Sequence, residues 1–576
     1  MNKVVWLAIN AQYTHTSLAV RYLREISKAY YNTEILELTI NNYIPDLLGY
    51  IYEARPTILG IACYIWNIEI VKTLLPLLKK VLPDTIIICG GPEVSYNTEK
   101  FMLAYPMVDY VVQGEGESSV RYLLEYFQHK RTALPAKGIS WRESDGELHI
   151  GMATDVANVE GIPFPYQEEE LDGIKDRILY YETSRGCPFS CAYCLSCATT
   201  GVRFLGIERV VQELTLLVAH DVKQVKFVDR TFNAKKSHFF PILQFIKSLP
   251  NTCRTNFHFE VAADYFDADT LDFLSLLPPG RVQLEVGIQS TNEHTLQAVS
   301  RVNHWDRITQ NIQHIIAGGN IHVHTDLIIG LPHEDMESFH HSFNEVYKLH
   351  SNQLQLGFLK FLSGASMMRL VETGGYLYEN QAPYEVLSNQ WMTYEEIHWL
   401  HVFEDVFERY HNAGRCVRTI SFLIDYCEAE DAFLFYKKFT DWWKAHGYHH
   451  RPHAEVRLYE MIFEFIKTTY NEDTVLTADA LLRLDLLESG RAHSWPACLN
   501  WSQEAYKKQI DDFWRTGKVK EYLEEFSFTN WHDIRSKYHI EVFERDPLNI
   551  EINNNNAVCI LFDYCNNKVR RYIVTL

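Results

Sequence analysis

The sequence predicts an α/β protein with an N-terminal doubly wound parallel sheet, a second α/β domain, and a mostly helical C-terminal domain. Short apolar strands alternate with single helices over residues 3–129, and the same rhythm returns over residues 178–361. Strands that are separated by single helices form parallel sheets covered by those helices. From residue 366 onward, aromatic residues recur at helical spacing instead. A chain of 576 residues is also too long for one hydrophobic core.

The composition is that of a globular protein without a nucleic-acid or membrane partner. Apolar residues make up 47% and charged residues 22%. The 54 basic and 74 acidic side chains give a net charge of -20 without a basic run, which disfavours nucleic acid. Apolar runs are too short to span a bilayer and no secretory signal is visible, so we expect a soluble, cytoplasmic protein. Twelve cysteines, three of them clustered, fit a reducing compartment.

The first domain is predicted from nine elements in order. We expect strands at 4–9, 34–38, 58–65, 85–89 and 110–112, and helices at 17–30, 68–81, 99–104 and 118–127. Ligands bind such sheets at the carboxyl ends of the strands. The loops after the first, third, fourth and fifth strands hold the candidates His15, Thr16, Ser17, Tyr64, Trp66, Gly90, Gly91, Pro92, Glu93, Gly114, Glu115 and Gly116. The paired glycines would let a flat ligand approach the backbone. A Walker loop and a G-x-G-x-x-G run are absent, which disfavours nucleotides.

A connector separates this domain from the next. Residues 138–141 and 147–150 predict a hairpin around Asp145-Gly146, and the rest is expected to be a solvated linker without a site. We therefore divide the chain into domains at 1–130, 178–365 and 366–576, with the linker at 131–177.

A compact cysteine loop opens the second α/β domain. The strand-like run from Tyr180 breaks at Gly186 and is followed by Cys187, Cys191 and Cys194. Three thiolates spaced C-x3-C-x2-C can hold three corners of a cubane iron-sulfur cluster and leave the fourth iron open. An amine and a carboxylate of one small molecule can chelate that iron. The rival interpretation is a four-ligand cluster or zinc site completed by Cys197.

Six strands are predicted in the second domain, and polar residues follow several of them. The strands are expected at 179–183, 225–228, 257–261, 282–287, 322–329 and 353–359. Reactive groups in βα barrels project from the carboxyl ends of the strands. The residues found there are Asp229, Arg230, Glu260, Asp264, Glu285, Gln289, Ser290, Asp326 and Gly330.

The cysteine loop, with Tyr193 before its third cysteine, resembles the signature loop of the radical S-adenosylmethionine (SAM) superfamily, and the six βα units match its partial (β/α)6 barrel. The preceding sheet with its GGPE and GEGE turns resembles the cobalamin domain of B12-dependent radical SAM proteins, and the chain resembles those with an uncharacterised C-terminal domain of the DUF4080 type. This resemblance implies a 4Fe-4S cluster on the three cysteines, SAM and cobalamin as cofactors, and cobalamin in the four loops given above. It assigns SAM contacts to Tyr193, Asp229, Glu260, Glu285, Gln289, Ser290 and Gly330.

The resemblance also implies an activity. The expected reaction is reductive cleavage of SAM to a 5'-deoxyadenosyl radical, followed by methyl transfer to an unactivated carbon of a small-molecule or peptide substrate. An external donor of the flavodoxin or ferredoxin type would supply electrons. Radical cyclisation or rearrangement without methyl transfer and a non-enzymatic cobalamin or redox sensor stay open. A tRNA methylthiolation enzyme would carry a second cysteine triad in the N-terminal domain, where only Cys63 and Cys89 occur.

Two segments leave further alternatives open. Many cobalamin domains have Asp-x-His-x-x-Gly after the first strand, whereas this chain has His15 between two threonines, so His15 is a cobalt ligand, a corrin contact or a helix cap. The aromatic stripe at 394–410 is either core or a lid over the substrate pocket. A small antiparallel sheet is expected at 560–564 and 569–574, and the asparagine run at 553–556 is a loop.

Overall fold

The computed structural model divides the chain into two compact units, residues 1–397 and 398–576. It describes residues 3–156, 158–198, 201–491, 494–501, 503–523, 526, 530–550, 557–565 and 569–576, without the side chains of 197, 198, 503 and 504. The predicted asparagine loop at 553–556 therefore lies outside the described residues. None of the described helices is both long enough and apolar enough to cross a bilayer.

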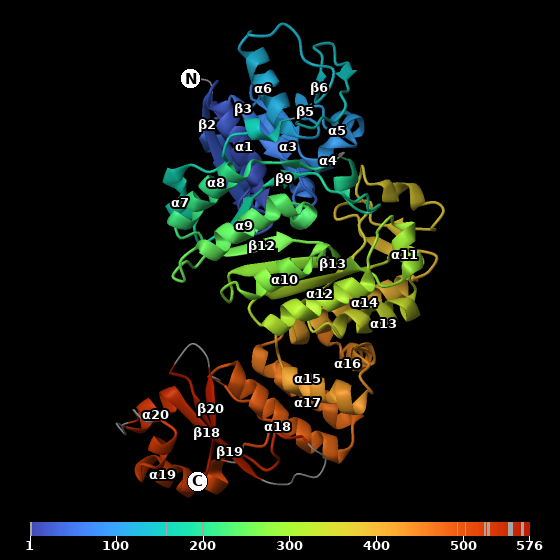
Figure 1. Ribbon diagram of the computed structural model, residues 1–576. Coiled ribbons are helices and arrows are strands. Elements are labelled where there is room, and N and C mark those ends of the chain that lie inside the picture. Colours follow the sequence, from blue (N-terminus) through green and yellow to red (C-terminus); the bar gives the residue numbers. More distant parts are fainter. Residues whose placement is uncertain are drawn as a thin grey trace. The chain divides into compact units, whose positions relative to one another are not determined.

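The first unit begins with the predicted doubly wound sheet. Its parallel strands run in the order β2-β1-β3-β4-β5 (Figure 1). They are β1 (Lys3–Asn10), β2 (Asn32–Thr39), β3 (Ile58–Ala62), β4 (Ile86–Gly90) and β5 (Tyr110–Val112). The predicted hairpin is also present, as β6 (Ile139–Arg142) and β7 (Leu148–His149). It pairs antiparallel with β5 and extends the sheet, so this part of the connector is not a solvated linker.

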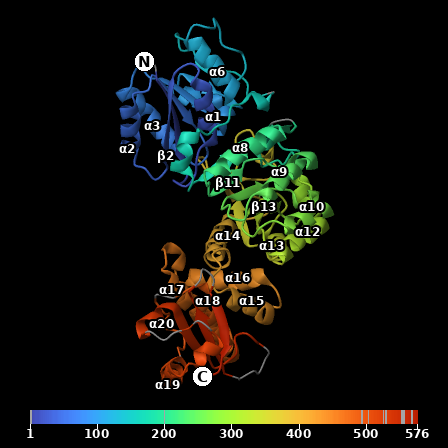
Figure 2. The ribbon, with the colours of Figure 1, turned by 60° about the vertical axis from the view of Figure 1, so that its left-hand side comes forward.

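Helices cover both faces of this sheet because successive side chains of each strand point to opposite faces. On one face, Trp6 and its neighbours pack against α1 (Leu18–Ser27) and α6 (Gly116–Phe127). On the other, Leu7 and its neighbours pack against α2 (Ile44–Ala54), α3 (Ile68–Val81) and α5 (Thr98–Ala104) (Figures 1 and 2). Helix α2 is absent from the sequence-based prediction. It carries Pro45 and Gly49, which are poor helix formers and obscure its apolar spacing.

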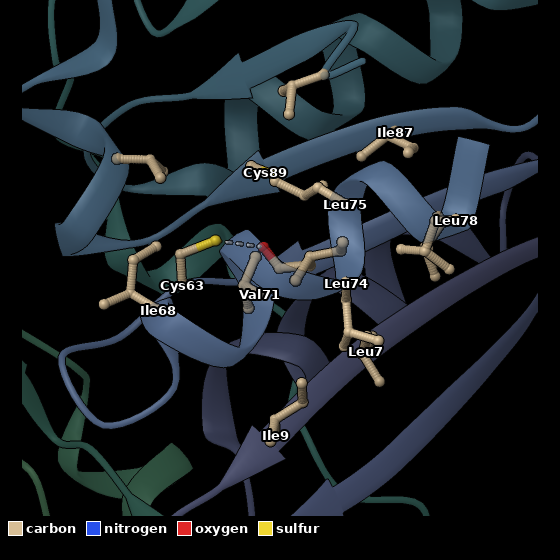
Figure 3. Close-up of a cluster of buried hydrophobic side chains, with 14 of the residues drawn as sticks. Leu7, Ile9, Cys63, Ile68, Val71, Leu74, Leu75, Leu78, Ile87 and Cys89 are labelled. Atoms are coloured by element: carbon tan, nitrogen blue, oxygen red, sulfur yellow. Dashed lines mark hydrogen bonds between the residues drawn. The ribbon is translucent and has the colours of Figure 1, made fainter. Parts of the chain in front are cut away.

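Cys63 and Cys89 belong to the core beneath α3. Both are fully buried among Leu7, Ile9 and the apolar face of α3, and the Cys63 thiol donates to the Ile61 carbonyl at 3.6 Å (Figure 3). These two thiols pack as small apolar groups.

The second sheet of the first unit has six strands, all parallel, in sequence order. They are β8 (Ile178–Tyr181), β11 (Gln224–Phe227), β12 (Asn256–Glu260), β13 (Val282–Gln289), β14 (His322–Ile329) and β15 (Gln353–Phe358). The helices that follow them are α8 (Ile207–Ala219), α9 (Lys236–Ser248), α10 (Ala268–Ser275), α11 (Glu293–Ala298), α12 (Trp305–Gly318) and α13 (Met336–Tyr347). The six parallel strands of the predicted partial barrel are confirmed, and helices follow the first five of them.

Loops of the first sheet contact both free edges of this partial barrel. At the β8 edge, the Ile178 N–H donates to the Thr14 carbonyl at 2.7 Å. Beyond β15, the Phe361 N–H donates to the Tyr384 carbonyl at 3.0 Å, and the Tyr384 hydroxyl donates to Glu93 at 2.7 Å. The two sheets are therefore tied together on both sides of the barrel opening.

The second unit is mainly helical, as predicted, with one small sheet. Its helices are α15 (Val417–Phe422), α16 (Ala432–Ala445), α17 (Glu455–Thr469), α18 (Glu472–Ser489), α19 (Gln503–Arg515) and α20 (Trp531–Lys537), and its sheet joins β18 (Tyr538–Phe543), β19 (Val558–Asp563) and β20 (Arg570–Val574). Helix α18 packs on one face of this sheet and α19 on the other. Of the aromatic stripe, Phe403, Phe407 and Tyr410 are fully buried, so these rings are core. A lid role for this unit stays a prediction.

Candidate functional site

Two short strands frame the cysteine loop. β9 (Ser184–Arg185) and β10 (Arg203–Phe204) pair antiparallel at its base. Gly186 follows β9 with a φ of +100°, and a Cβ there would overlap the carbonyl of Gly201. Only glycine meets both conditions without strain. The glycine before the first cysteine therefore makes the sharp turn that starts the loop.

The three predicted cluster ligands converge in this loop. Burial raises the pKa of the Cys187 thiol, and the neighbouring Cys194 and Cys191 thiols raise it further, which places the three side chains within electrostatic reach. Among the described residues, no three Cys, His, Asp or Glu side chains are arranged to share one metal ion. In a cubane cluster each cysteine thiolate binds a different iron, so the three Sγ atoms do not bind one common metal ion. The C-x3-C-x2-C donor set fits three corners of a cubane cluster, and the side chain of the rival ligand Cys197 lies outside the described residues.

Each of these sulfur atoms has a polar neighbour. The Thr231 hydroxyl lies 3.4 Å from Cys187 Sγ, and the Ser196 N–H donates to Cys194 Sγ at 3.4 Å. Arg301 donates through Nη1 to Cys191 Sγ at 3.7 Å and to the Tyr193 hydroxyl at 3.2 Å. The sequence analysis missed Thr231 and Arg301, which come from distant loops and carry no local motif. Hydrogen bonds to cluster sulfurs set the potential and orientation of such a centre.

The inner face of the barrel is polar. Along β13 and β14, the residues that face the surrounding helices are buried and, except for Thr325, apolar, while the alternate residues are partly accessible. The inward residues include Glu260, Glu285, Gln289 and Asp326. Gln289 Oε1 and Asp326 Oδ1 are buried without a hydrogen-bond partner. These unpaired atoms, near the carboxyl ends of the strands, suit the donors of an adenosyl or amino-acid group.

Glu285 lies deeper in the barrel and is already paired. Its Oε2 accepts from His258 at 2.9 Å and from Lys226 at 3.0 Å. Burial raises the pKa of Glu285, but these two partners outweigh it and lower the pKa to about 2. For Glu260, burial raises the pKa, opposed by Arg230.

Three other predicted SAM contacts have structural partners. Asp229 is buried at the end of β11 and accepts from the Thr183 and Ser184 hydroxyls at 2.6 and 2.5 Å, which ties β11 to the start of the cysteine loop. Ser290 is fully buried and donates to Glu334 at 2.7 Å. A Cβ at Gly330 would meet Val386 at 2.8 Å. Glu334, which the sequence analysis missed, is buried as well, and burial raises its pKa to about 7.

Replacing Asp326 by Asn should change the pH dependence of stability. Burial, with Glu285 and Glu260 adding to it and Lys226 and Arg301 opposing it, raises the pKa of Asp326 from 3.8 to about 8. The folded state therefore keeps a proton that the unfolded chain loses, so this carboxyl lowers stability as pH rises from about 4 to about 8.

We expect Asp326→Asn to have a melting temperature above wild type at about pH 8 and equal to it near pH 4, as measured by thermal unfolding across this range. The exposed Leu103 of α5 provides the control, because Leu103→Ala changes no titratable group and should show a constant difference from wild type. An equally constant difference for Asp326→Asn would contradict the assignment.

The loop after β1 is held against the barrel. The His15 ring nitrogen Nδ1 lies 2.6 Å from the Tyr180 hydroxyl on β8, and the two rings stack with centroids 5.9 Å apart. Burial lowers the pKa of His15, with help from Lys226 and Arg177. The Thr16 hydroxyl donates to the Ile178 carbonyl at 2.9 Å. Ser17 is the N-cap residue of α1 and its N–H donates to Glu37. His15 thus does not cap the helix, and Nε2 is its nitrogen left for a corrin or cobalt.

The loop after β3 presents a flat aromatic surface. The Tyr64 and Trp66 rings stack with centroids 4.5 Å apart and planes inclined by 5°. The Trp66 indole donates to the Ile9 carbonyl at 3.0 Å, and the Trp66 side chain is 43% exposed. A stacked pair whose Trp66 ring is exposed at the carboxyl edge of the sheet suits a large planar ligand.

The glycine turn after β4 is required by packing. Gly91 has a φ of +112°, and a Cβ there would lie 2.5 Å from the Cys63 carbonyl oxygen. Gly90 ends β4, where its Cβ would have ordinary contact with Val112, and Pro92 begins α4 (Pro92–Ser95). The Glu93 carboxylate accepts from Tyr384, and burial raises its pKa. Gly91 therefore allows the turn to pack closely against the backbone of Cys63, rather than against a ligand.

We expect Gly91→Ala to destabilise the first unit by about 1–3 kcal/mol, because alanine is strained at this φ and collides with the backbone. Gly49, within α2, provides the matched control, because a Cβ added there would meet no described side chain within 4 Å. Gly49→Ala should stabilise by roughly 0.5–1 kcal/mol. Urea denaturation of both variants measures the two effects, and a neutral Gly91→Ala would contradict this role.

The turn after β5 also contacts the barrel. Gly114 has a φ of +76° and packs against Thr154, and Gly116 begins α6. Glu115 forms an ion pair with Arg203 at 2.6 Å, next to the cysteine loop. The structure therefore brings the four candidate loops to one edge of the sheet, but several of their side chains are engaged with the barrel.

Family models match three consecutive parts of the chain. The B12 binding domain matches residues 4–124, the radical SAM superfamily residues 181–346, and the protein of unknown function DUF4080 residues 372–562. These matches coincide with the first sheet, the partial barrel and most of the second unit.

Relatives and solved structures agree with this organisation. The cobalamin-dependent radical SAM methyltransferase TokK of Streptomyces tokunonensis is 29% identical over 310 residues, which is 50% of this chain and 44% of TokK. An anaerobic magnesium-protoporphyrin IX monomethyl ester cyclase of Cereibacter sphaeroides is 21% identical over 50% of this chain and 49% of its own. The chain thus spans about half the length of these curated relatives.

The fold likeness to a solved structure covers more of the chain. The cobalamin-dependent S-adenosylmethionine radical enzyme OxsB with aqua-cobalamin bound has a TM-score of 0.59 at 14% identity, over 93% of this chain and 82% of OxsB. The chain thus carries, in order, a B12-binding domain, a radical SAM domain and a DUF4080 domain.

Proposed function

We propose that this protein is a cobalamin-dependent radical SAM enzyme that cleaves SAM reductively to a 5'-deoxyadenosyl radical and transfers a methyl group to an unactivated carbon. The observation that carries the proposal is the three-cysteine loop at the mouth of a partial barrel whose free edges contact the carboxyl-end loops of a B12-binding sheet. A cluster site and a corrin site would then lie at the facing ends of the partial barrel and the B12-binding sheet. TokK, a methyltransferase by name, supports the reaction type.

The described residues fit both cofactors. Cys187, Cys191 and Cys194 would hold a 4Fe-4S cluster, and Gln289, Asp326 and Glu260 would bind SAM through their inward polar atoms. The Tyr64 and Trp66 rings and the backbone of the four loops would hold cobalamin. When bound, these groups supply an electron for SAM cleavage and a carrier for the methyl group.

The chain's own residues would position the cluster ligands and hold the two sheets together. Thr231, Ser196 and Arg301 would orient the cysteine sulfurs, while the contacts of the loops beside β8 and beyond β15 hold the two sheets together. A small-molecule or peptide substrate would bind near the polar inner face of β13 and β14. An external flavodoxin or ferredoxin would deliver the electrons.

Anaerobic reconstitution with iron, sulfide and hydroxocobalamin tests the proposal. We expect a protein that binds both cofactors and forms 5'-deoxyadenosine from SAM with dithionite as reductant. If the protein formed a cluster but bound no corrin, the proposed radical chemistry would stand and the cobalamin assignment would be contradicted. Binding of both cofactors without formation of 5'-deoxyadenosine would favour a sensor instead.

Radical cyclisation without methyl transfer is the second candidate, supported by the likeness to the protoporphyrin ester cyclase. The products separate the two reactions. Methyl transfer consumes a second SAM and yields S-adenosylhomocysteine, whereas cyclisation yields 5'-deoxyadenosine alone. Quantifying both nucleosides in one assay with substrate decides between them.

A further inference from the structure

Two arginines hold the base of the cysteine loop to the B12-binding domain. Arg185 ends β9 just before the loop, and Arg203 begins β10 just after it, directly opposite in the strand pairing. Arg203 forms two hydrogen bonds with Glu115, at 2.6 and 2.9 Å. Arg185 forms ion pairs with Glu117 and with Glu182, the latter at 2.7 Å, and lies 3.5 Å from Glu115. Glu115 and Glu117 flank the turn after β5.

This cluster of charges, which we call the arginine clamp (Arg185, Arg203, Glu115, Glu117 and Glu182), is shielded from solvent. Its side chains are between 11% and 19% exposed. The backbone reinforces the clamp, because the Val156 N–H donates to Glu115 and the Glu115 N–H donates to the Thr154 carbonyl at 2.8 Å. Partly buried, multiply bonded ion pairs are screened less and held more rigidly than surface pairs.

The clamp spans the two proposed cofactor sites. On one side it ends in the turn after β5, at the carboxyl edge of the sheet, where a corrin would lie. On the other side, a single glycine separates Arg185 from Cys187. A cluster that fixes the cysteine loop also fixes Arg185 and Arg203, and a corrin that fixes the turn also fixes Glu115 and Glu117.

From this geometry we infer that cluster binding and cobalamin binding are positively coupled through the arginine clamp. Because the clamp joins the two loops rigidly, a cofactor that fixes one loop also restricts the other, so the second cofactor to bind loses less conformational entropy than the first. The coupling acts equally in both directions. The inference rests on the proposed cofactors and adds that Arg185, Arg203, Glu115 and Glu117 are positioning residues for both.

Equilibrium titration with hydroxocobalamin, without SAM or substrate, tests this coupling. The dissociation constant is measured by absorbance for full-length protein without iron and for the same protein after anaerobic reconstitution of the cluster. We expect the reconstituted protein to bind cobalamin about tenfold more tightly, within the ~5–150-fold range of typical couplings. Reciprocally, bound cobalamin should slow removal of iron by a chelator.

Charge-neutral variants identify the clamp as the cause. In Glu117→Gln and Arg185→Gln the ratio of the two dissociation constants should fall toward one, while each variant still binds each cofactor alone. Arg24→Gln is the matched control, because Arg24 forms a bidentate pair with Glu170 of α7 (Glu168–Ile174), outside the clamp, at 2.7 and 2.9 Å. It should keep the wild-type ratio.

The outcomes separate this inference from the proposed function. If wild-type protein binds both cofactors independently, the coupling is wrong and the proposed function stands. If cobalamin binds under neither condition, the cofactor assignment itself fails. A wild-type ratio retained in Glu117→Gln and Arg185→Gln would overturn the role of the clamp. The wild-type titration remains decisive even if Arg185→Gln does not fold.

Discussion

Replacing any of Cys187, Cys191 and Cys194 by Ala is expected to abolish the cluster and with it the formation of 5'-deoxyadenosine. Each thiol would hold one of three corners of the cluster, and the described surroundings offer hydrogen-bond donors to the sulfurs. Loss of groups that merely orient metal ligands costs about 10–100-fold in affinity or activity, and loss of a ligand should cost more. Iron content, cluster absorbance and the nucleoside assay measure the effect.

Two further cysteines serve as controls. Cys253, a half-buried free thiol on the connection between α9 and β12, should be replaceable by Ala without loss of iron. Cys197→Ala should also keep the cluster if one iron is open to SAM. Loss of the cluster in Cys197→Ala would show a fourth protein ligand and remove the basis for SAM cleavage.

Arg483→Ala is expected to give the largest loss of stability in the second unit. Arg483 on α18 and Glu541 on β18 form an ion pair at 2.7 Å with side-chain exposures of 2% and 0%. Glu541 also pairs with His539 at 2.9 Å. Removing the guanidinium leaves a buried carboxylate without its main partner, which costs about 3–5 kcal/mol. Chemical denaturation followed by the fluorescence of the tryptophans reports the change.

Comparison variants distinguish a buried charge from general loss of contacts. The double replacement Arg483→Met with Glu541→Leu removes both charges and should recover most of the stability. Lys437 and Asp441 form an exposed pair at 2.8 Å with 49% exposure each, so Lys437→Ala should cost less than about 1 kcal/mol. Equal losses in Arg483→Ala and in the double variant would contradict the electrostatic explanation.

The strands and the cysteine loop were predictable because their signals are local. β14 follows the predicted bounds, and the spacing of the three cysteines lies within eight residues of chain. Arg301 and Thr231 were not predictable, because they reach the cysteines from 110 and 44 residues away. Contacts of that kind depend on barrel closure, which no local pattern encodes.

The direction of side chains at the ends of strands was the second feature that could not be predicted from the sequence. Ser290 was predicted to bind SAM because it follows β13, but the register shifts between Gly287 and Gln289. Such an irregularity changes which residues face inward. Ser290 donates to Glu334, Gln289 keeps an unpaired oxygen, and the SAM contact of Ser290 stays a prediction. Likewise, Glu115 was expected at a corrin and is engaged by Arg203.

The backbone contact between residues 14–16 and Ile178 has a practical consequence for dissecting the chain. A fragment that begins at residue 178 would leave the outer edge of β8 without its neighbour, and exposed strand edges recruit other chains. Such a fragment should self-associate at concentrations where residues 1–397 remain monodisperse. Truncation studies of this family of folds are therefore better designed around the first unit as a whole than around its barrel.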